Sequence, residues 1–191
     1  MKALSIAATG MLAQQLNVEV ISNNIANMNT TAYKRQRAEF QDLLYQNIER
    51  AGAASSDAGT IVPTGIQIGV GVRTAGVYRV TSQGELVNSD TALDIAINGK
   101  GYFRVQLPNG DDSYTRAGSF QLSPQGEIVT SEGYTVSPGI TIPQEAIDIT
   151  INANGEVLVS IEGQLEPQNV GQFEVVTFPN NAGLQATGEN L

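Results

Sequence analysis

The hydrophobic pattern is clearest at the start of the chain, where apolar residues recur in alternating steps of three and four. This spacing predicts an amphipathic helix over residues 1–28 with a heptad seam along one side. The seam comprises Leu4, Ala7, Met11, Gln14, Val18, Ile21 and Ile25, and six of these seven residues are apolar. A helix of this kind is marginal in water unless its apolar side is covered. Because no other segment carries a matching seam, we expect the partner helix to come from another chain or from outside this sequence.

Two other interpretations of this helix stay open. Lys2 and the small, apolar residues 3–13 are partly typical of a secretory signal, but Ser5, Thr9 and Gly10 interrupt the apolar stretch. The seam also continues beyond any cleavage point, so we expect the segment to be retained. Alternatively, the helix docks on its own domain and needs no second chain.

Helical periodicity ends in residues 22–34, where Asn and Thr crowd together as they do at helix exits. Phe40, Leu43 and Leu44 then suggest a short helical turn. Residues 46–65 are mostly small and polar, which is typical of a linker or an excursion from the fold. We therefore treat residues 31–75 as a connecting region.

From residue 66 the hydrophobic period changes to two, and short strand candidates recur between Gly, Asn, Asp and Pro turns. The candidates are 66–72, 76–80, 93–97, 102–107, 113–116, 119–122, 128–130, 134–136, 147–151, 157–161 and 173–178. They predict an antiparallel β body, a sandwich or irregular barrel, over residues 76–185, followed by a tail at 186–191. The expected fold class is mainly β with an N-terminal α-helix, a helical assembly segment and an extended linker.

The amino-acid composition excludes several kinds of chemical site. The 191 residues include no Cys and no His, which excludes disulfides, Cys/His zinc sites and imidazole or thiolate catalysis. Residues 1–50 hold five basic and four acidic side chains, whereas residues 51–191 hold five and fifteen. The net charges are thus +1 and −10, and an acidic body of this kind argues against nucleic acid as a partner.

Three sequence patterns suggest chemical sites, but the sequence does not support any of them. Asp111 and Asp112 beside Asn109 lack the spacing of an EF-hand calcium loop. The stretch GVGVRT at 69–74 lacks the third Gly of a dinucleotide loop. Four carboxylates could in principle serve glycoside cleavage, but most lie beside turns: Glu127, Glu132, Glu156 and Glu162. We therefore expect no enzyme, no cofactor, no metal and no small-molecule substrate.

Two separate motifs carry a resemblance to a known family. The helix exit SNNIAN at 22–27, followed by TTAYKR at 30–35, resembles the N-terminal signature of bacterial flagellar rod and hook proteins. In the β body, GKGYFRV at 99–105, YTRAGSF at 114–120 and GYTV at 133–136 resemble the block shared by that family. The stretch RQRAEFQDLLYQ at 35–46, with GIQIG at 65–69, is most similar to the distal rod branch.

The resemblance implies a structural subunit of the flagellar basal body. In this family, subunits polymerise helically into a rigid drive shaft that crosses the periplasm, and the N-terminal helix pairs with a C-terminal helix that is absent from this chain. The implied partners are copies of the chain, adjacent rod and hook proteins, the surrounding P and L ring proteins and the flagellar export apparatus. Export without a cleaved signal peptide is also implied.

The resemblance also assigns roles to residues and ranges. Residues 1–30 form the axial core segment, and the family motif includes Asn23, Asn24, Ala26, Asn27, Tyr33 and Lys34. The rod-stiffening extension spans 46–65 and includes Gln46, Ser55, Ser56, Pro63 and Gly65. Two alternatives remain: a proximal rod or hook subunit of the same family, and a self-contained, β-rich secreted adhesin-like domain.

Overall fold

The computed structural model describes residues 2–49, 64–164, 166–188, 190 and 191. One N-terminal helix is followed by antiparallel strands, which confirms the predicted mainly β fold class. The chain divides into two compact units. The first comprises Met1–Asn29 and Lys34–Val80, and the second comprises Thr30–Tyr33 and Thr81–Leu191. The first unit ends at Val80, just after strand β4 (Val72–Arg79). The β body was predicted to begin at residue 76, within this strand.

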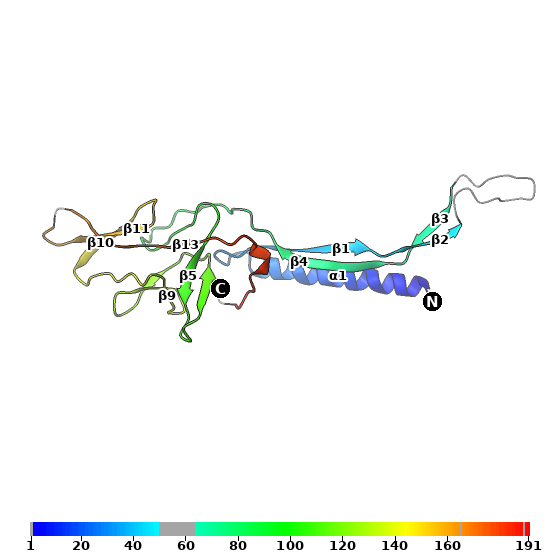
Figure 1. Cartoon of the computed structure of the whole chain (residues 1–191), viewed down its shortest axis with the longest axis horizontal. Helices are drawn as coiled ribbons and strands as arrows, with labels where there is room; N and C mark the ends of the chain where they lie inside the picture. Colours follow the sequence, from blue (N-terminus) through cyan, green and yellow to red (C-terminus); the bar gives the residue numbers. More distant parts are fainter. Residues whose placement is uncertain (1, 50–63, 165, 189) are drawn as a thin grey trace, which may run out of the picture. The chain divides into compact units, whose positions relative to one another are not determined.

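The first unit is built on helix α1 (Lys2–Ala26) and a two-stranded antiparallel ladder of β1 (Gln36–Asp42) and β4. The helix lies along both strands (Figure 1). Half-buried and exposed residues alternate through most of β1, as they do in a strand with one covered face. A bulge lies at Ala75 of β4, because Glu39 pairs with Gly76 while the next residue of β1 pairs with Thr74.

A second, shorter ladder belongs to the same unit. Strand β2 (Tyr45–Glu49) pairs antiparallel with β3 (Ile66–Gly69), so that Tyr45 lies opposite Gly69 and Gln46 opposite Ile68. The residues between these strands, 50–63, lie outside the described part of the chain. A two-stranded ladder has little stability of its own in water and depends on whatever packs against it.

The second unit contains two antiparallel sheets. The larger is formed by β5 (Tyr102–Gln106), β6 (Asp112–Thr115), β7 (Gln121–Leu122), β8 (Ile128–Val129), β9 (Thr135–Val136) and β13 (Val175–Val176). Its path is β13-β5-β9-β8-β7, and β6 also pairs with β5. The smaller sheet has the order β10 (Ala146–Ile151), β11 (Glu156–Ile161) and β12 (Gln168–Gln172). A short 3-10 helix, η1 (Asn181–Gly183), follows β13.

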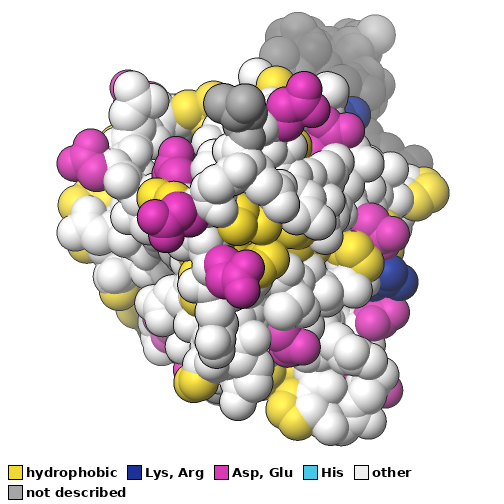
Figure 2. All heavy atoms as spheres, turned by 90° about the vertical axis from the view of Figure 1, so that its left-hand side faces the viewer, with side chains coloured by type: hydrophobic (Ala, Val, Ile, Leu, Met, Phe, Trp, Pro, Cys, Tyr) yellow, Lys and Arg dark blue, Asp and Glu magenta, His cyan; other side chains and the backbone are white. Residues whose placement is uncertain are grey.

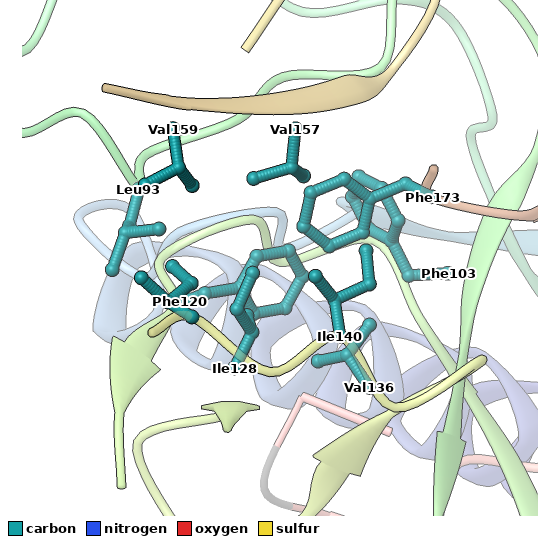
Figure 3. Close-up of a cluster of buried hydrophobic side chains, with 10 residues drawn as sticks. Leu93, Phe103, Phe120, Ile128, Val136, Ile140, Val157, Val159 and Phe173 are labelled. Carbon is teal, nitrogen blue, oxygen red and sulfur yellow. The ribbon is translucent and has the colours of Figure 1, made fainter. Parts of the chain in front are cut away.

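The two sheets share one core. Figure 3 shows side chains of both sheets, Phe103, Ile128, Val136, Val157 and Val159, meeting side chains from the connections between strands, Leu93, Phe120, Ile140 and Phe173. The ring centroids of Phe103 and Phe120 are 5.1 Å apart and nearly perpendicular, while Phe120 and Phe173 are stacked at 5.7 Å. These are the preferred geometries of aromatic pairs. The core therefore explains why residues widely separated in sequence form a single unit.

Several sequence expectations need correction. The helical turn expected around Phe40, Leu43 and Leu44 is wrong, because Phe40 lies in β1 and the other two lie between strands. The strand expected at 93–97 contains only a single bridge, from Asp94 to Ser119. Besides the strand expected at 66–72, the predicted connecting region 31–75 contains two strands that were not predicted, β1 and β2. Strand β12 was not predicted, because its residues are mostly polar.

Candidate assembly surface

One face of α1 is docked on the β1–β4 ladder. Ala13 and Val20 are buried, with 5% and 8% of their surfaces exposed, and Ile6, seven residues before Ala13, is half-buried. Leu16 and Asn24 are also half-buried. The spacing of seven puts Ile6, Ala13 and Val20 on one line along the helix. The expectation that the helix has no partner within this sequence is therefore wrong for this face.

A close approach of α1 to the ladder occurs at Thr9. The Thr9 hydroxyl donates to the Ile6 carbonyl at 2.8 Å and accepts a bond from the Val72 backbone N–H at 3.4 Å. The neighbouring Gly71 has φ +129°, and a Cβ there would overlap Thr9 Oγ1 and lie 3.4 Å from Thr9 Cβ. Glycine at position 71 thus allows the helix to touch the backbone of the strand.

A second polar contact lies near the other end of the helix. The Asn24 side chain donates through Nδ2 to the Gln36 carbonyl at 2.8 Å, and its Oδ1 accepts from the Gln36 N–H at 2.8 Å. The amide of Asn24 therefore bonds to the main chain at the start of β1 much as a neighbouring strand would. This predicted motif residue positions the strand relative to the helix.

The other motif residues lie around the helix exit. The Asn23 carbonyl accepts both the backbone N–H of Asn27, at 3.1 Å, and its side-chain Nδ2, at 3.0 Å, which closes the last turn. Ala26 is exposed at the end of α1. Tyr33 and Lys34 are half-buried, and the Tyr33 N–H donates to the Thr30 carbonyl at 3.2 Å. These residues therefore shape the turn between α1 and β1.

The predicted extension is only partly described. Gln46 lies in β2, and its Oε1 accepts a bond from Lys2 Nζ at 2.8 Å, which links the start of α1 to the β2–β3 ladder. Gly65 is half-buried immediately before β3. Ser55, Ser56 and Pro63 lie outside the described residues.

The seam lies on a different side of the helix from the docked face. Met11 and Val18 precede the buried Ala13 and Val20 by two residues, which is a rotation of about 200° around the helix axis. All seven seam residues are exposed, including Leu4 (73%), Met11 (68%) and Val18 (60%). A stripe of large apolar side chains left in water is typical of an interaction surface. The described residues of this chain do not cover it.

The β2–β3 ladder is also apolar and exposed. Its large exposed side chains, with those flanking it, are Leu44, Tyr45, Ile48, Ile66, Ile68 and Val70. A hydrogen bond with Asp42, helped by the negative charge of that carboxylate, raises the pKa of Tyr45 above its ordinary value. The first unit therefore presents two apolar surfaces, the seam and this ladder.

Sequence reasoning found the seam but missed the docked face. Ile6, Ala13 and Val20 have the same spacing as the seam, but Thr9 and Gly10 interrupt them and conceal the stripe. The glycines of the GVG stretch at 69–71 could have indicated the docked face, because glycine in a strand often marks a close approach of another backbone.

Among the described residues, no three His, Cys, Asp or Glu side chains gather closely enough to hold a metal ion. Asn109 Nδ2 instead donates to the Asp111 carboxylate at 2.7 Å within a hairpin turn. A hollow of about 310 Å³ between the β5–β6 and β8–β9 turns is lined by no carboxylate or cation. In the same described ranges, no helix combines the length and apolarity that membrane crossing requires.

Comparison with known proteins agrees with both sequence motifs. Residues 4–34 match the family described as "Flagella basal body rod protein". Residues 96–159 match the "Flagellar hook protein FlgE/F/G D1 domain". The flagellar basal-body rod protein FlgG of Caulobacter vibrioides is 61% identical over 191 residues, which cover 100% of this chain and 73% of that protein. The chain belongs to the FlgG family.

More distant relatives also favour FlgG over the hook protein FlgE. FlgG of Bacillus subtilis is 35% identical over 195 aligned positions, covering 100% of this chain and 72% of that protein. The flagellar hook protein FlgE of Helicobacter mustelae is also 35% identical, but over 71% of this chain and only 30% of that protein. The FlgG family is a family of structural rod proteins of the flagellar basal body, not of enzymes.

Proposed function

We propose that the chain is a subunit of the distal rod and polymerises helically into the rigid drive shaft that crosses the periplasm. The observation that carries the proposal is the exposed seam on a helix whose other face is already docked. Docking orders the helix within the subunit, and the seam is left to bury against a second helix when subunits assemble. Residues 1–30 then form the axial core, 31–75 the connecting region and 76–185 the outer β domain.

The partners follow from this role. Copies of the chain supply the lateral contacts, and adjacent rod and hook proteins contact the ends of the polymer. The P and L ring proteins surround it, and the flagellar export apparatus delivers the subunit without cleavage of a signal peptide. Membership of the FlgG family supports these assignments, which match the basal-body rod named for its members.

The proposal assigns a stiffening role to the extension at 46–65. The exposed apolar side chains of β2 and β3 support it, because a two-stranded ladder of this kind needs further packing for stability. Shortening residues 50–63 in the full protein should leave assembly intact and lower the bending stiffness of the rod, seen as curved polymers by electron microscopy. Straight polymers of normal stiffness would favour the proximal rod alternative.

Charge substitution in the seam tests the polymer directly. Met11→Asp and Val18→Asp should abolish assembly measured by sedimentation, because burying an unpaired carboxylate costs far more than the roughly 2–7 kcal/mol of an unpaired neutral polar group. Ser5→Asp is the matched control: position 5 is exposed on the same helix, and no seam residue lies three or four positions from it. All three variants should keep the near-ultraviolet circular dichroism of the folded β unit. Normal assembly of both seam variants would refute the proposal.

A further inference from the structure

The two units of the chain differ sharply in charge. The first, Met1–Asn29 with Lys34–Val80, has seven basic and five acidic side chains, a net charge of +2. The second, Thr30–Tyr33 with Thr81–Leu191, has three basic and fourteen acidic side chains, a net charge of −11. Residues 117–191 hold nine acidic side chains and no Lys or Arg at all. One chain thus carries both a mildly basic unit and a strongly acidic one.

Two of the three cations of the acidic unit are already engaged. Arg104 pairs with Asp112 at 3.7 Å and with Glu174 at 2.9 Å. Arg116 donates to the carbonyl of Gly101 at 2.7 Å and to Gln83 Oε1 at 2.7 Å, within a group of backbone oxygens. Neither guanidinium is therefore available to neutralise the carboxylates of the smaller sheet.

Those carboxylates gather at one end of the β10–β11 hairpin. Ala146 pairs with Ile161, which places the adjacent Glu145 and Glu162 at the same end of the sheet, and Glu166 follows in the connection to β12. All three glutamates are exposed. Figure 2, which faces the side of the molecule that holds β10 and β11, shows acidic side chains spread over this surface with few basic ones. We call Glu145, Glu162 and Glu166 the acidic edge.

The basic counterpart lies on the outer face of the β1–β4 ladder. Arg37 is exposed in β1, and Arg73 pairs in register with Gln41 on the same side of that strand, so both belong to the face that α1 does not cover. Arg35 lies just before β1, where its carbonyl accepts the Val80 N–H at 2.9 Å, and the exposed Glu39 lies on the same face between Arg37 and Gln41. All three arginines are exposed, and Arg73 donates to Gln41 Oε1 at 3.0 Å. None forms an ion pair with any residue in the described ranges. We call Arg35, Arg37 and Arg73 the arginine face.

We propose that the arginine face of one copy of the chain binds the acidic edge of a second copy. This inference rests on the proposed function, because it supplies one of the contacts of the polymer. The contact joins two different surfaces, so it is heterologous and leaves one surface of each kind open at the two ends of any pair. Repeated contacts of this type extend a helical polymer. Opposite charges at such a contact speed association and fix its register.

Charge reversal in the full-length protein tests the contact. Arg37→Glu with Arg73→Glu should slow assembly about tenfold or more at low salt, as electrostatic steering predicts, and the difference should shrink as salt screens the contact. Glu145→Lys with Glu162→Lys should slow assembly similarly. The control is Lys100→Glu, an exposed cation outside both surfaces, which should assemble at the wild-type rate. Circular dichroism establishes that each variant is folded.

Mixing the two double variants gives the decisive result. The reversed charges attract each other again in mixed contacts, so an equimolar mixture should assemble faster than either variant alone. Failure of the mixture to recover, or wild-type assembly by each variant alone, would overturn the proposal. If arginine variants lose binding to anionic lipid vesicles but assemble normally, the arginine face serves a membrane surface and the proposal also falls. A wild-type chain that stays monomeric at every salt concentration would instead refute the polymer itself.

Discussion

Replacing Gly71 with Ala should undock α1 from the ladder, because this position combines an unusual backbone conformation with a close contact. The φ of +129° is one that residues with a Cβ rarely adopt, which costs about 1–3 kcal/mol. The new methyl group would also overlap Thr9 Oγ1. If Thr9 rotates away, its hydrogen bonds to Ile6 and Val72 are lost, at about 1 kcal/mol each.

The backbone cost and the two lost hydrogen bonds sum to about 3–5 kcal/mol, and rotation of Thr9 relieves the overlap itself. Because 1.4 kcal/mol is a factor of ten, the equilibrium for opening of the helix should shift about 100-fold or more. Amide hydrogen exchange of α1 measures this shift directly, and the second unit should keep its protection.

Gly76→Ala is the matched control, since a Cβ at position 76 of the same strand would meet nothing within 4 Å. Alanine there should be neutral or stabilise the ladder by up to about 1 kcal/mol. Thr9→Ala combined with Gly71→Ala should cost little more than Gly71→Ala alone, because the single variant has already lost both hydrogen bonds of the Thr9 hydroxyl. If Gly71→Ala and Gly76→Ala leave the exchange of α1 equally slow, the proposed close contact is wrong.

Three further outcomes are expected. Asn24→Ala removes two hydrogen bonds of 2.8 Å and should destabilise the end of α1 by about 1–3 kcal/mol, measured by hydrogen exchange of its last turns. Gly118→Ala should unfold the second unit in thermal melts, because its Cβ would overlap a backbone carbonyl, whereas Gly84→Ala, with nothing within 4 Å, should not. The Tyr45 hydroxyl should titrate above its ordinary value, and Asp42→Asn should lower that pKa in an absorbance titration. Because the pKa of Tyr45 is raised in the folded chain, its hydrogen bond with Asp42 stabilises the fold fully at pH values below the ordinary tyrosine pKa. That stabilisation is lost as the pH rises through the raised pKa.

Two strands with alternating burial were predictable from the sequence. β5 and the first part of β11 follow from their period of two, which matches a sheet with one covered face. β1 was not predicted, because QRAEFQD has no strong strand preference and becomes a strand only by pairing with β4, whose paired residues lie 30 to 43 positions further along the chain. Pairing with β4 in the folded chain, not local strand propensity, therefore makes residues 36–42 a strand.

The same distinction applies to the candidate surface. The seam is visible in the sequence because its residues lie on one helix and their spacing alone puts them together. The docked face depends on Thr9 meeting Gly71 and on Asn24 meeting Gln36, and no periodicity links these positions. The arginine face likewise requires the register of two strands before Arg37 and Arg73 are brought to one side.

The bond from Asn24 to residue 36 has a consequence for how this sequence can vary during evolution. The Asn24 amide bonds to the main-chain N–H and carbonyl of residue 36, so these two bonds place no demand on the side chain at that position. Position 24 has no such freedom, because aspartate would lack the donor and a hydrophobic residue would lack both groups. Sequences of this type can therefore drift at the start of β1 while an asparagine is retained in the last turn of α1.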